Sequence, residues 1–161
     1  MPLHPSAQKV IEAAAQLGLE IAVTEFPQGT RTAVDAANAI GCTVGQIVKS
    51  LCFTVQGEPV MALVSGDNQL DERKLAAAFG VGRKQVKRAD AETVKAATGF
   101  AIGGVPPFGH LRPMTIFVDN DLAQYEVIWA AGGTPNAVFP ITPGELTVVT
   151  GGRWLDLKRQ E

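Results

Sequence analysis

The chain has 161 residues, 46% of them apolar and 19% charged, which suits one globular domain over residues 1–161 and excludes wholesale disorder. Its formal net charge of −2 excludes a protein that holds long nucleic acid by overall positive charge. The longest apolar runs have only a few residues, far below the ~20 that span a bilayer, and Met1–Ser6 shows no signal-peptide pattern. We therefore expect a cytoplasmic protein without a membrane partner.

The first part of the chain alternates helix and strand signals. Ser6 is a favourable N-cap for a helix with an apolar stripe, and Gly18 is expected to end that helix. A second, alanine-rich helix is expected to open at Thr32 and to end at Gly41. We expect, in chain order, a helix over 7–17, a strand over 21–26, a helix over 33–40, and a hairpin of strands over 51–55 and 60–64.

The second part of the chain continues this alternation. Gly80 and Gly99 are expected to end two helices, and Thr142 opens a capping box with Pro143 at the first helical position. We expect, in order, helices over 71–79 and 90–98, strands over 114–118, 126–129 and 137–141, a helix over 143–150 and a strand over 153–157. Hairpins and short helices, without regular strand–helix–strand repetition, predict an α+β domain with a mixed sheet.

Metal and cofactor chemistry finds little support in this sequence. Cys42 and Cys52 match no redox or zinc spacing, and His4 and His110 are too scattered to complete a zinc site. We expect two reduced, packed thiols, with a disulfide left open, and no metal and no cofactor. The motifs of serine hydrolases, zincins, Rossmann enzymes and P-loop NTPases are absent. The pair of carboxyls within 119–121 is more typical of a turn than of a metal site.

Lys49 is the first candidate functional residue. If a strand begins near Val48, Lys49 lies on the same side as the apolar Leu51 and Phe53. Such a lysine either places its ammonium in water at the strand end, which the segment alone favours, or directs a point charge at an anionic group such as a phosphate. A second polar signal, typical of the mouth of a site, follows an apolar strand at Ser65, Gly66 and Asp67.

A glycine–proline loop is the second candidate. The backbone N–H groups of Gly103, Gly104 and Val105 precede two prolines, Pro106 and Pro107, that restrict the loop. Such a segment is usually an ordinary turn. Alternatively, its N–H groups act as fixed donors to a carbonyl oxygen or an oxyanion.

Further candidates follow that loop. His110 is either a surface residue, the commoner case, or a general base. The glycine-rich segment with Gly132, Thr134 and Asn136 is equally a hairpin turn or a pocket wall. Seven of the fourteen basic residues lie between Arg73 and Lys95. Such a run is usually a solvated surface, and alternatively a patch that guides a polyanion to a small site.

Taken together, the segments 46–51, 64–67, 103–109 and 131–139 resemble the YbaK/EbsC family, the free-standing relatives of the editing domain inserted in bacterial prolyl-tRNA synthetase. The resemblance runs from about Val10 to Leu157. It implies a largely antiparallel, barrel-like sheet with several short helices packed around it. It also implies a trans-acting deacylase that hydrolyses the ester of mischarged tRNA, with tRNA-Pro carrying a small non-cognate amino acid as the expected substrate.

The resemblance also implies roles for individual residues. Lys49 matches the family's essential lysine, which contacts the phosphate of the terminal adenosine, and Gly103 belongs to the loop whose backbone holds the aminoacyl group. Substrate-binding residues are then expected at Ser65, Gly66, Asp67, Gly104, Val105, Pro106, Pro107, His110, Gly132, Thr134 and Asn136. Some relatives have a histidine near the second loop, where this chain has Thr134 and Asn136. The implied partners are the tRNA acceptor end and an aminoacyl-tRNA synthetase.

The residues present suit this chemistry. An aminoacyl ester is already activated, so its hydrolysis needs a positioned water and oxyanion stabilisation more than a strong nucleophile. Our hypothesis is that a substrate hydroxyl activates the water. Two other functions remain: a non-catalytic module that binds tRNA or a synthetase, and a hydrolase of small free esters. Incubation with mischarged tRNA separates the first from an enzyme, because a binder protects the ester and an enzyme cleaves it.

Overall fold

The computed structural model describes residues 3–160; Met1, Pro2 and Glu161 lie outside the described residues, and with them part of the segment for which no signal peptide is predicted. The helices are α1 (Pro5–Gln16), α2 (Ala33–Ile40), α3 (Glu72–Ala78), α4 (Ala91–Thr98) and α5 (Pro143–Thr150). The strands are β1 (Thr24–Glu25), β2 (Val48–Val55), β3 (Glu58–Ser65), β4 (Val86–Arg88), β5 (Ile116–Asp119), β6 (Ile128–Ala131), β7 (Ala137–Ile141) and β8 (Arg153–Leu155).

Two sheets form the framework. The larger has the strand order β4-β2-β3-β5-β8 and the smaller the order β1-β7-β6. The β2–β3 hairpin is antiparallel, whereas β3–β5 and β5–β8 are parallel pairs, so the predicted α+β class with a mixed sheet is confirmed. A bridge between Ile47 and Trp129 joins the sheets. The arrangement is barrel-like, although the two sheets do not close into a barrel within residues 3–160.

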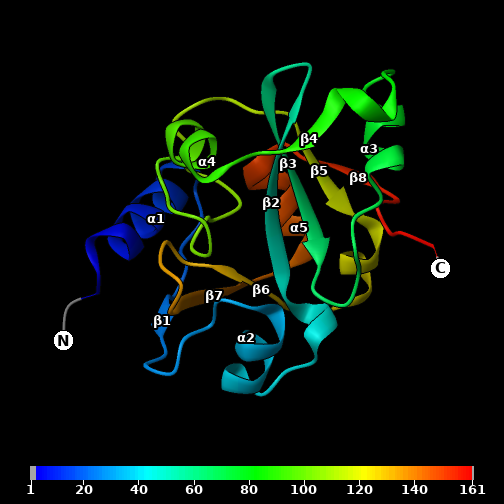
Figure 1. The fold of residues 1–161 in the computed structure, drawn as a ribbon. Coiled ribbons are helices and arrows are strands. Elements are labelled where there is room, and N and C mark those ends of the chain that lie inside the picture. Colours follow the sequence, from blue (N-terminus) through cyan, green and yellow to red (C-terminus); the bar gives the residue numbers. More distant parts are fainter. Residues whose placement is uncertain (1–2, 161) are drawn as a thin grey trace.

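The helices surround this framework. In Figure 1, β2 and β3 run through the centre, and β6 and β7 cross below them. The helix α5 lies behind the larger sheet, α1 and α4 lie to its left, α3 to its right and α2 below. No helix in the described part of the chain has both the length and the apolar character that crossing a bilayer requires.

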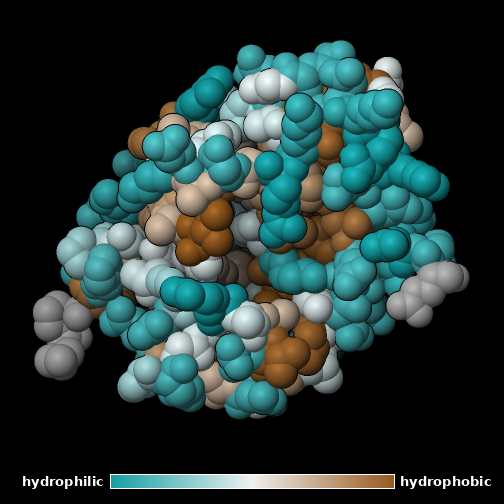
Figure 2. Space-filling view, in the orientation of Figure 1, coloured by the Kyte–Doolittle hydropathy of each residue, from teal (hydrophilic) through white to brown (hydrophobic). Residues whose placement is uncertain are grey.

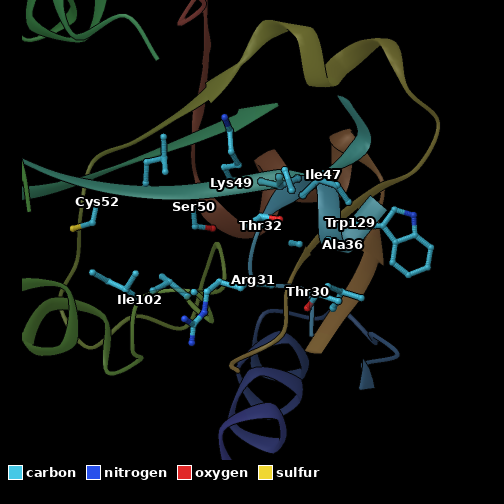
Figure 3. Close-up of a pocket in the computed structure, with 18 of the residues that line it drawn as sticks. Thr30, Arg31, Thr32, Ala36, Ile47, Lys49, Ser50, Cys52, Ile102 and Trp129 are labelled. Atoms are coloured by element: carbon cyan, nitrogen blue, oxygen red, sulfur yellow. The ribbon is translucent and has the colours of Figure 1, made fainter. Parts of the chain in front are cut away.

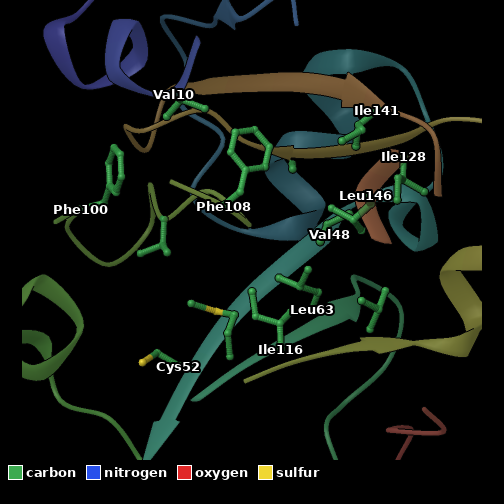
Figure 4. Close-up of a cluster of buried hydrophobic side chains, with 14 of the residues drawn as sticks. Val10, Val48, Cys52, Leu63, Phe100, Phe108, Ile116, Ile128, Ile141 and Leu146 are labelled. Atoms are coloured by element: carbon green, nitrogen blue, oxygen red, sulfur yellow. The ribbon is translucent and has the colours of Figure 1, made fainter. Parts of the chain in front are cut away.

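The main core fills the space between the two sheets. Val48, Leu63 and Ile116 from the larger sheet face Ile128 and Ile141 from the smaller one (Figure 4). A second buried cluster covers the opposite side of the larger sheet, beneath α3. Because both faces of β2 and β3 are covered, these strands appear in the sequence as nearly continuous apolar runs.

The helix ends agree with the sequence, with one exception. Thr32 caps α2 by accepting a hydrogen bond from Asp35 N at 3.0 Å, and the capping box at Thr142 is present. The prediction that Ser6 is the first N-cap is wrong: His4 takes that position, and its ring accepts a hydrogen bond from Ser6 N. Pro5 explains the shift, because a proline suits the first helical position, where no N–H is needed.

The strand boundaries differ more. The predicted strand over 21–26 shortens to Thr24–Glu25, the only two residues there that pair with β7. The three-residue strand β4 was not predicted, because its one apolar, buried residue, Val86, is followed by two exposed basic residues and gives no apolar alternation. The strand β2 begins at Val48 rather than Leu51, which places Lys49 inside it.

Candidate active site

A cavity of about 370 Å³ opens on one face of the molecule. Its lining residues are drawn from within the segments 30–36, 47–52, 88–94, 102–105 and 129–138, which are far apart in the sequence and do not line it at every position. Figure 2 shows this face hollowed near its centre, with polar and apolar side chains around the opening. The cavity therefore lies where the free edge of β2, the start of α2, the glycine–proline loop and the smaller sheet meet.

The strand β2 presents alternate residues to different surroundings. Ser50 and Cys52 lie on the side of the strand that faces the cavity, whereas the side chain of Lys49 leaves the opposite side (Figure 3). Leu51 and Phe53 pack into the cluster beneath α3, on the side that alternation gives to Lys49. The predicted register of Lys49 is thus confirmed, and Lys49 lines the same cavity as Gly103 and Val105.

The ammonium of Lys49 is half-buried and donates a hydrogen bond to the carbonyl oxygen of Asn68. Burial lowers the pKa of Lys49 and the nearby positive charge of Arg88 lowers it further, whereas the carboxylates of Asp119 and Asp67 raise it. The lowered pKa means that the charge is incompletely compensated by its surroundings. An anionic group beside the ammonium would stabilise the charged form.

A polar network fixes the turn that Lys49 contacts. The side-chain amide of Asn68 donates to carboxylate oxygens of Asp119 at 2.9 Å and Asp121 at 2.8 Å, and Ser65 N donates to Asp119 at 3.1 Å. Asp119 is only 1% exposed, so these N–H donors satisfy a buried carboxylate. The two carboxyls therefore brace this turn. Asp119 also caps the short helix Asn120–Gln124, accepting from Asp121 N at 3.0 Å, which agrees with the predicted turn and cap at 119–121. Asn68 was missed, although it directly follows the polar signal at the end of β3.

The predicted residues Ser65, Gly66 and Asp67 form this turn and do not line the cavity. Ser65 Oγ donates to the carbonyl oxygen of Gly45 at 2.6 Å. Gly66 packs so closely on α2 that an added Cβ would lie 2.9 Å from Cβ of Ala33, and Asp67 is exposed. These residues therefore belong to the turn against which the Lys49 side chain rests.

The glycine–proline loop reaches the cavity through Gly103 and Val105. Gly103 has φ +96°, which favours glycine, and the N–H of Gly104 is already used, since it donates to Ala101 O at 3.1 Å. In this conformation the Gly104 N–H is therefore engaged within the loop, and its role as a donor to an oxyanion stays a prediction. Within residues 3–160, the N–H groups of Gly103 and Val105 have no hydrogen-bond acceptor.

The two glycine-rich loops are in direct backbone contact. Gly133 N donates to Gly104 O at 3.0 Å, and an added Cβ on Gly104 would lie 2.7 Å from backbone atoms of Thr134. Gly132 N donates to Ala137 O at 2.8 Å, and Thr134 Oγ1 accepts from Asn136 N at 3.3 Å. Gly104, Gly132, Thr134 and Asn136 are outside the cavity lining. The second loop is thus a turn that supports the first.

His110 supports the same loop from outside the cavity. Its Nε2 lies 2.7 Å from the carbonyl oxygen of Pro106, and Pro106 and Pro107 are buried without lining the cavity. Burial lowers the pKa of His110, and the hydrogen bond to Pro106 opposes this effect. A neutral ring with its proton on Nε2 donates to Pro106 and holds the proline pair in place.

Two arginines line the cavity; Arg31 was not predicted, and Arg88 was predicted only as a member of the basic stretch 73–95. Arg31 lies beside Gly103, with Nε 3.7 Å from the position of an added Cβ, and Arg88 has its guanidinium carbon 5.5 Å from the ring centroid of Phe53. Neither forms an ion pair within the described residues. Arg88 is the one basic residue of the stretch 73–95 that lines the cavity, whereas Arg83 pairs with Glu72 at 3.0 Å.

Comparison with known proteins identifies the family to which this fold and this cavity belong. The chain matches the model of the aminoacyl-tRNA editing domain over residues 27–148 and belongs to that family. It is 32% identical over 137 residues to YwhH of Bacillus subtilis, covering 84% of this chain and 85% of that protein.

Two further relatives carry functional names. The candidate Cys-tRNA(Pro)/Cys-tRNA(Cys) deacylase EbsC of Enterococcus faecalis is 28% identical over 132 residues, which are 81% of this chain and 79% of EbsC. A crystal structure of a candidate trans-editing enzyme for prolyl-tRNA synthetase superposes with a TM-score of 0.93 and 46% identity, covering 99% of this chain and all of that one. The resemblance to the YbaK/EbsC family is therefore confirmed.

Proposed function

We propose that this protein is a trans-acting deacylase that hydrolyses the ester between a small non-cognate amino acid and tRNA, with tRNA-Pro as the expected carrier. Its membership of the editing-domain family and the names of EbsC and of the trans-editing enzyme support this proposal. The observation that carries it is that Lys49, Gly103 and Val105 line one cavity although Lys49 and Gly103 are more than fifty residues apart.

The geometry suggests how the substrate lies. Lys49 and Arg88 are cations on or beside β2, and Arg31 is a cation at the opposite side of the cavity, so the terminal phosphates would bind at its mouth. The ester then reaches the N–H groups of Gly103 and Val105. Water adds to the carbonyl carbon, the bond to the ribose oxygen breaks, and that oxygen leaves with a proton. Donors placed for the developing oxyanion accelerate this step.

Two nearby side chains are poorly suited to activate the water. His110 is bonded to Pro106 and does not line the cavity, and the thiol of Cys52 has its pKa raised by burial. The ribose hydroxyl next to the ester is therefore proposed as the activating group. Replacing that hydroxyl by hydrogen should slow enzymatic hydrolysis strongly, and unchanged hydrolysis would remove this part of the proposal.

The proposed partners follow from the same site. We expect the protein to contact the tRNA acceptor end and to work in the cytoplasm, where charged tRNA is found, with a synthetase as a further partner. The few cations around the cavity suit the end of one RNA strand, not a long duplex.

The experiment is a deacylation panel on tRNA-Pro charged with alanine, serine, cysteine, threonine or 2-aminobutyrate. Accelerated release of at least one amino acid, lost in Lys49→Ala, supports the proposal. A protein that slows spontaneous hydrolysis is the binding module instead. Hydrolysis of small free aminoacyl esters at the same efficiency, without tRNA, would favour the esterase.

A further inference from the structure

Three hydroxyl side chains line the cavity, and two of them are already engaged. Thr30 Oγ1 donates to the carbonyl oxygen of Pro135 at 2.9 Å, which ties the start of the α2 segment to the second glycine-rich loop. Thr32 Oγ1 accepts from Asp35 N at 3.0 Å as the cap of α2. Each of these two hydroxyls therefore already has one hydrogen-bond partner within the protein.

The third hydroxyl, that of Ser50, has no partner. Its Oγ is the one buried side-chain nitrogen or oxygen without a hydrogen bond in the described part of the chain. A buried polar atom without a partner is costly and uncommon in native proteins, so it calls for a missing partner. Ser50 lies on the cavity side of β2 (Figure 3), and rotation about Cα–Cβ gives its hydroxyl three staggered positions.

The surroundings of Ser50 leave room for that partner. On this edge of β2, β4 pairs with Phe53–Val55 and the bridge from Ile47 to Trp129 joins the smaller sheet. Between these contacts, no strand of residues 3–160 pairs with the edge at Ser50. The cavity therefore reaches β2 at Ser50, and because the Oγ atom is buried as it stands, a ligand meets it after rotation about Cα–Cβ.

The neighbouring walls offer a ligand little else that is polar. Side chains from Val48, Val105, Ala130 and Val138 line the cavity, and they are apolar. Burial raises the pKa of the Cys52 thiol, so Cys52 stays protonated and is a weak partner. The Arg31 guanidinium also lines the cavity but can only donate, so Ser50 is the lining side chain that offers a substrate hydroxyl both a free donor and a free acceptor.

We propose that Ser50 determines amino-acid specificity, and that the site prefers a small hydroxylated side chain, serine or threonine, over the same side chain without its hydroxyl. This inference rests on the proposed deacylase function. A hydroxyl of the substrate satisfies Ser50 and is itself satisfied, whereas alanine or 2-aminobutyrate leaves Ser50 unpaired. A site built to hydrogen-bond a substrate hydroxyl discriminates against the analogue that lacks it.

The test compares deacylation of tRNA-Pro charged with two matched pairs, serine against alanine and threonine against 2-aminobutyrate. In the natural protein we expect kcat/KM to favour the hydroxylated member of each pair by roughly 10- to 100-fold, as one unmet hydrogen bond implies. In Ser50→Ala the ratio should fall to within about 3-fold of unity, mainly through slower hydrolysis of the hydroxylated members. Ser50→Thr keeps a hydroxyl and should keep a preference.

Controls separate this inference from damage to the strand and from the proposed function. Thr54→Ala removes a hydroxyl from the same strand outside the cavity and should leave both ratios unchanged. The melting temperature of Ser50→Ala should not fall, because the lost hydroxyl has no partner. An equal loss on all four substrates, or an unchanged ratio, would overturn the role of Ser50 while leaving the deacylase standing. No hydrolysis of any substrate would overturn both.

Discussion

The two sides of β2 differ in the kind of group that they present to a ligand. On one side, Ser50 and Cys52 face the cavity among apolar walls. On the other side, Lys49 rests on the carbonyl oxygen of Asn68, and Arg88 lies over the ring of Phe53. Successive residues of one strand therefore face two different surroundings: Ser50 faces a largely apolar pocket that has Arg31 on its far wall, and Lys49 lies on a cationic surface.

This difference has a consequence for how an aminoacyl-tRNA would bind. Alternation directs Lys49 and Ser50 to opposite sides, so one substrate that meets both must cross the free edge of β2. The phosphate would lie on the cationic side and the amino acid on the cavity side. The acceptor end of a tRNA, with a small amino acid at its terminus, is long enough to contact both Lys49 and Ser50. A small free ester is too short to contact both residues.

The cationic side is tested first, because its loss should have the largest effect. Lys49→Ala should lower kcat/KM for deacylation by on the order of 10²-fold, since removal of one partner of a desolvated charge pair is costly. The far-ultraviolet circular dichroism and the melting temperature report whether the variant folds. Lys84→Ala, an exposed lysine outside the cavity, is the control. A folded Lys49→Ala with the activity of the natural protein would show that the cationic side does not hold the substrate.

The second test disturbs the contact between the two glycine-rich loops beside the cavity. Gly104→Ala places a Cβ 2.7 Å from the backbone of Thr134, and neither loop can move without breaking the hydrogen bond between Gly133 and Gly104. We expect a loss of about 1–3 kcal/mol in the free energy of unfolding in urea, together with reduced deacylation. Gly144→Ala, where an added Cβ meets nothing within 4 Å, should be nearly neutral. Equal stability of the two variants would contradict the tight contact between the loops.

The third test asks whether the two arginines of the cavity, Arg31 and Arg88, also hold the RNA. Arg31→Ala and Arg88→Ala should each raise KM by roughly 3- to 10-fold and lower the slope of log affinity against log salt by about 1, as the loss of one phosphate contact does. Arg83→Ala is the matched control, because Arg83 pairs with Glu72 away from the cavity. If all three variants lose affinity equally, the whole basic stretch, and not the cavity mouth, attracts the RNA.

The smallest effect is expected at His110. Its pKa is lowered in the folded protein, so between that value and the unfolded value near 6.5 the unfolded chain binds more protons. The stability that the neutral ring contributes is therefore complete above about pH 6.5 and is lost as the pH falls. We measure the melting temperatures of the natural protein and of His110→Gln at pH 7.5 and 5.5. The difference between the two proteins should be smaller at pH 5.5 than at pH 7.5. Parallel curves would mean that the ring does not brace Pro106.

Local signals account for most of the secondary structure. Thr32 and Thr142 each place a hydroxyl where the first turn of a helix has free N–H groups, and these contacts are complete within four residues of chain. The hairpin of β2 and β3 follows in the same way from two apolar runs around a turn. The failures have the opposite origin, since β4 and the two residues of β1 form strands only because a strand far away in the sequence pairs with them.

The site was predicted less completely, for a different reason. Lys49, Gly103 and Val105 carry recognisable patterns, and the structure brings them to one cavity. Ser65, Thr134 and Asn136 carry patterns of the same kind but lie behind the lining, where they support it. A pattern of small and polar residues marks a shaped turn, and it does not say on which side of that turn the ligand lies.

The order of helices and strands, their caps and the alternation along β2 were determined by the amino-acid sequence itself, because each depends on neighbours within a few residues. The convergence of Arg31, Ser50 and Arg88 was decided by the tertiary structure alone. These residues come from a loop, a central strand and an edge strand, and they meet only after two apolar clusters have packed on both faces of the larger sheet. The distances between these side chains are set by the packing of the core, which does not depend on their polar groups.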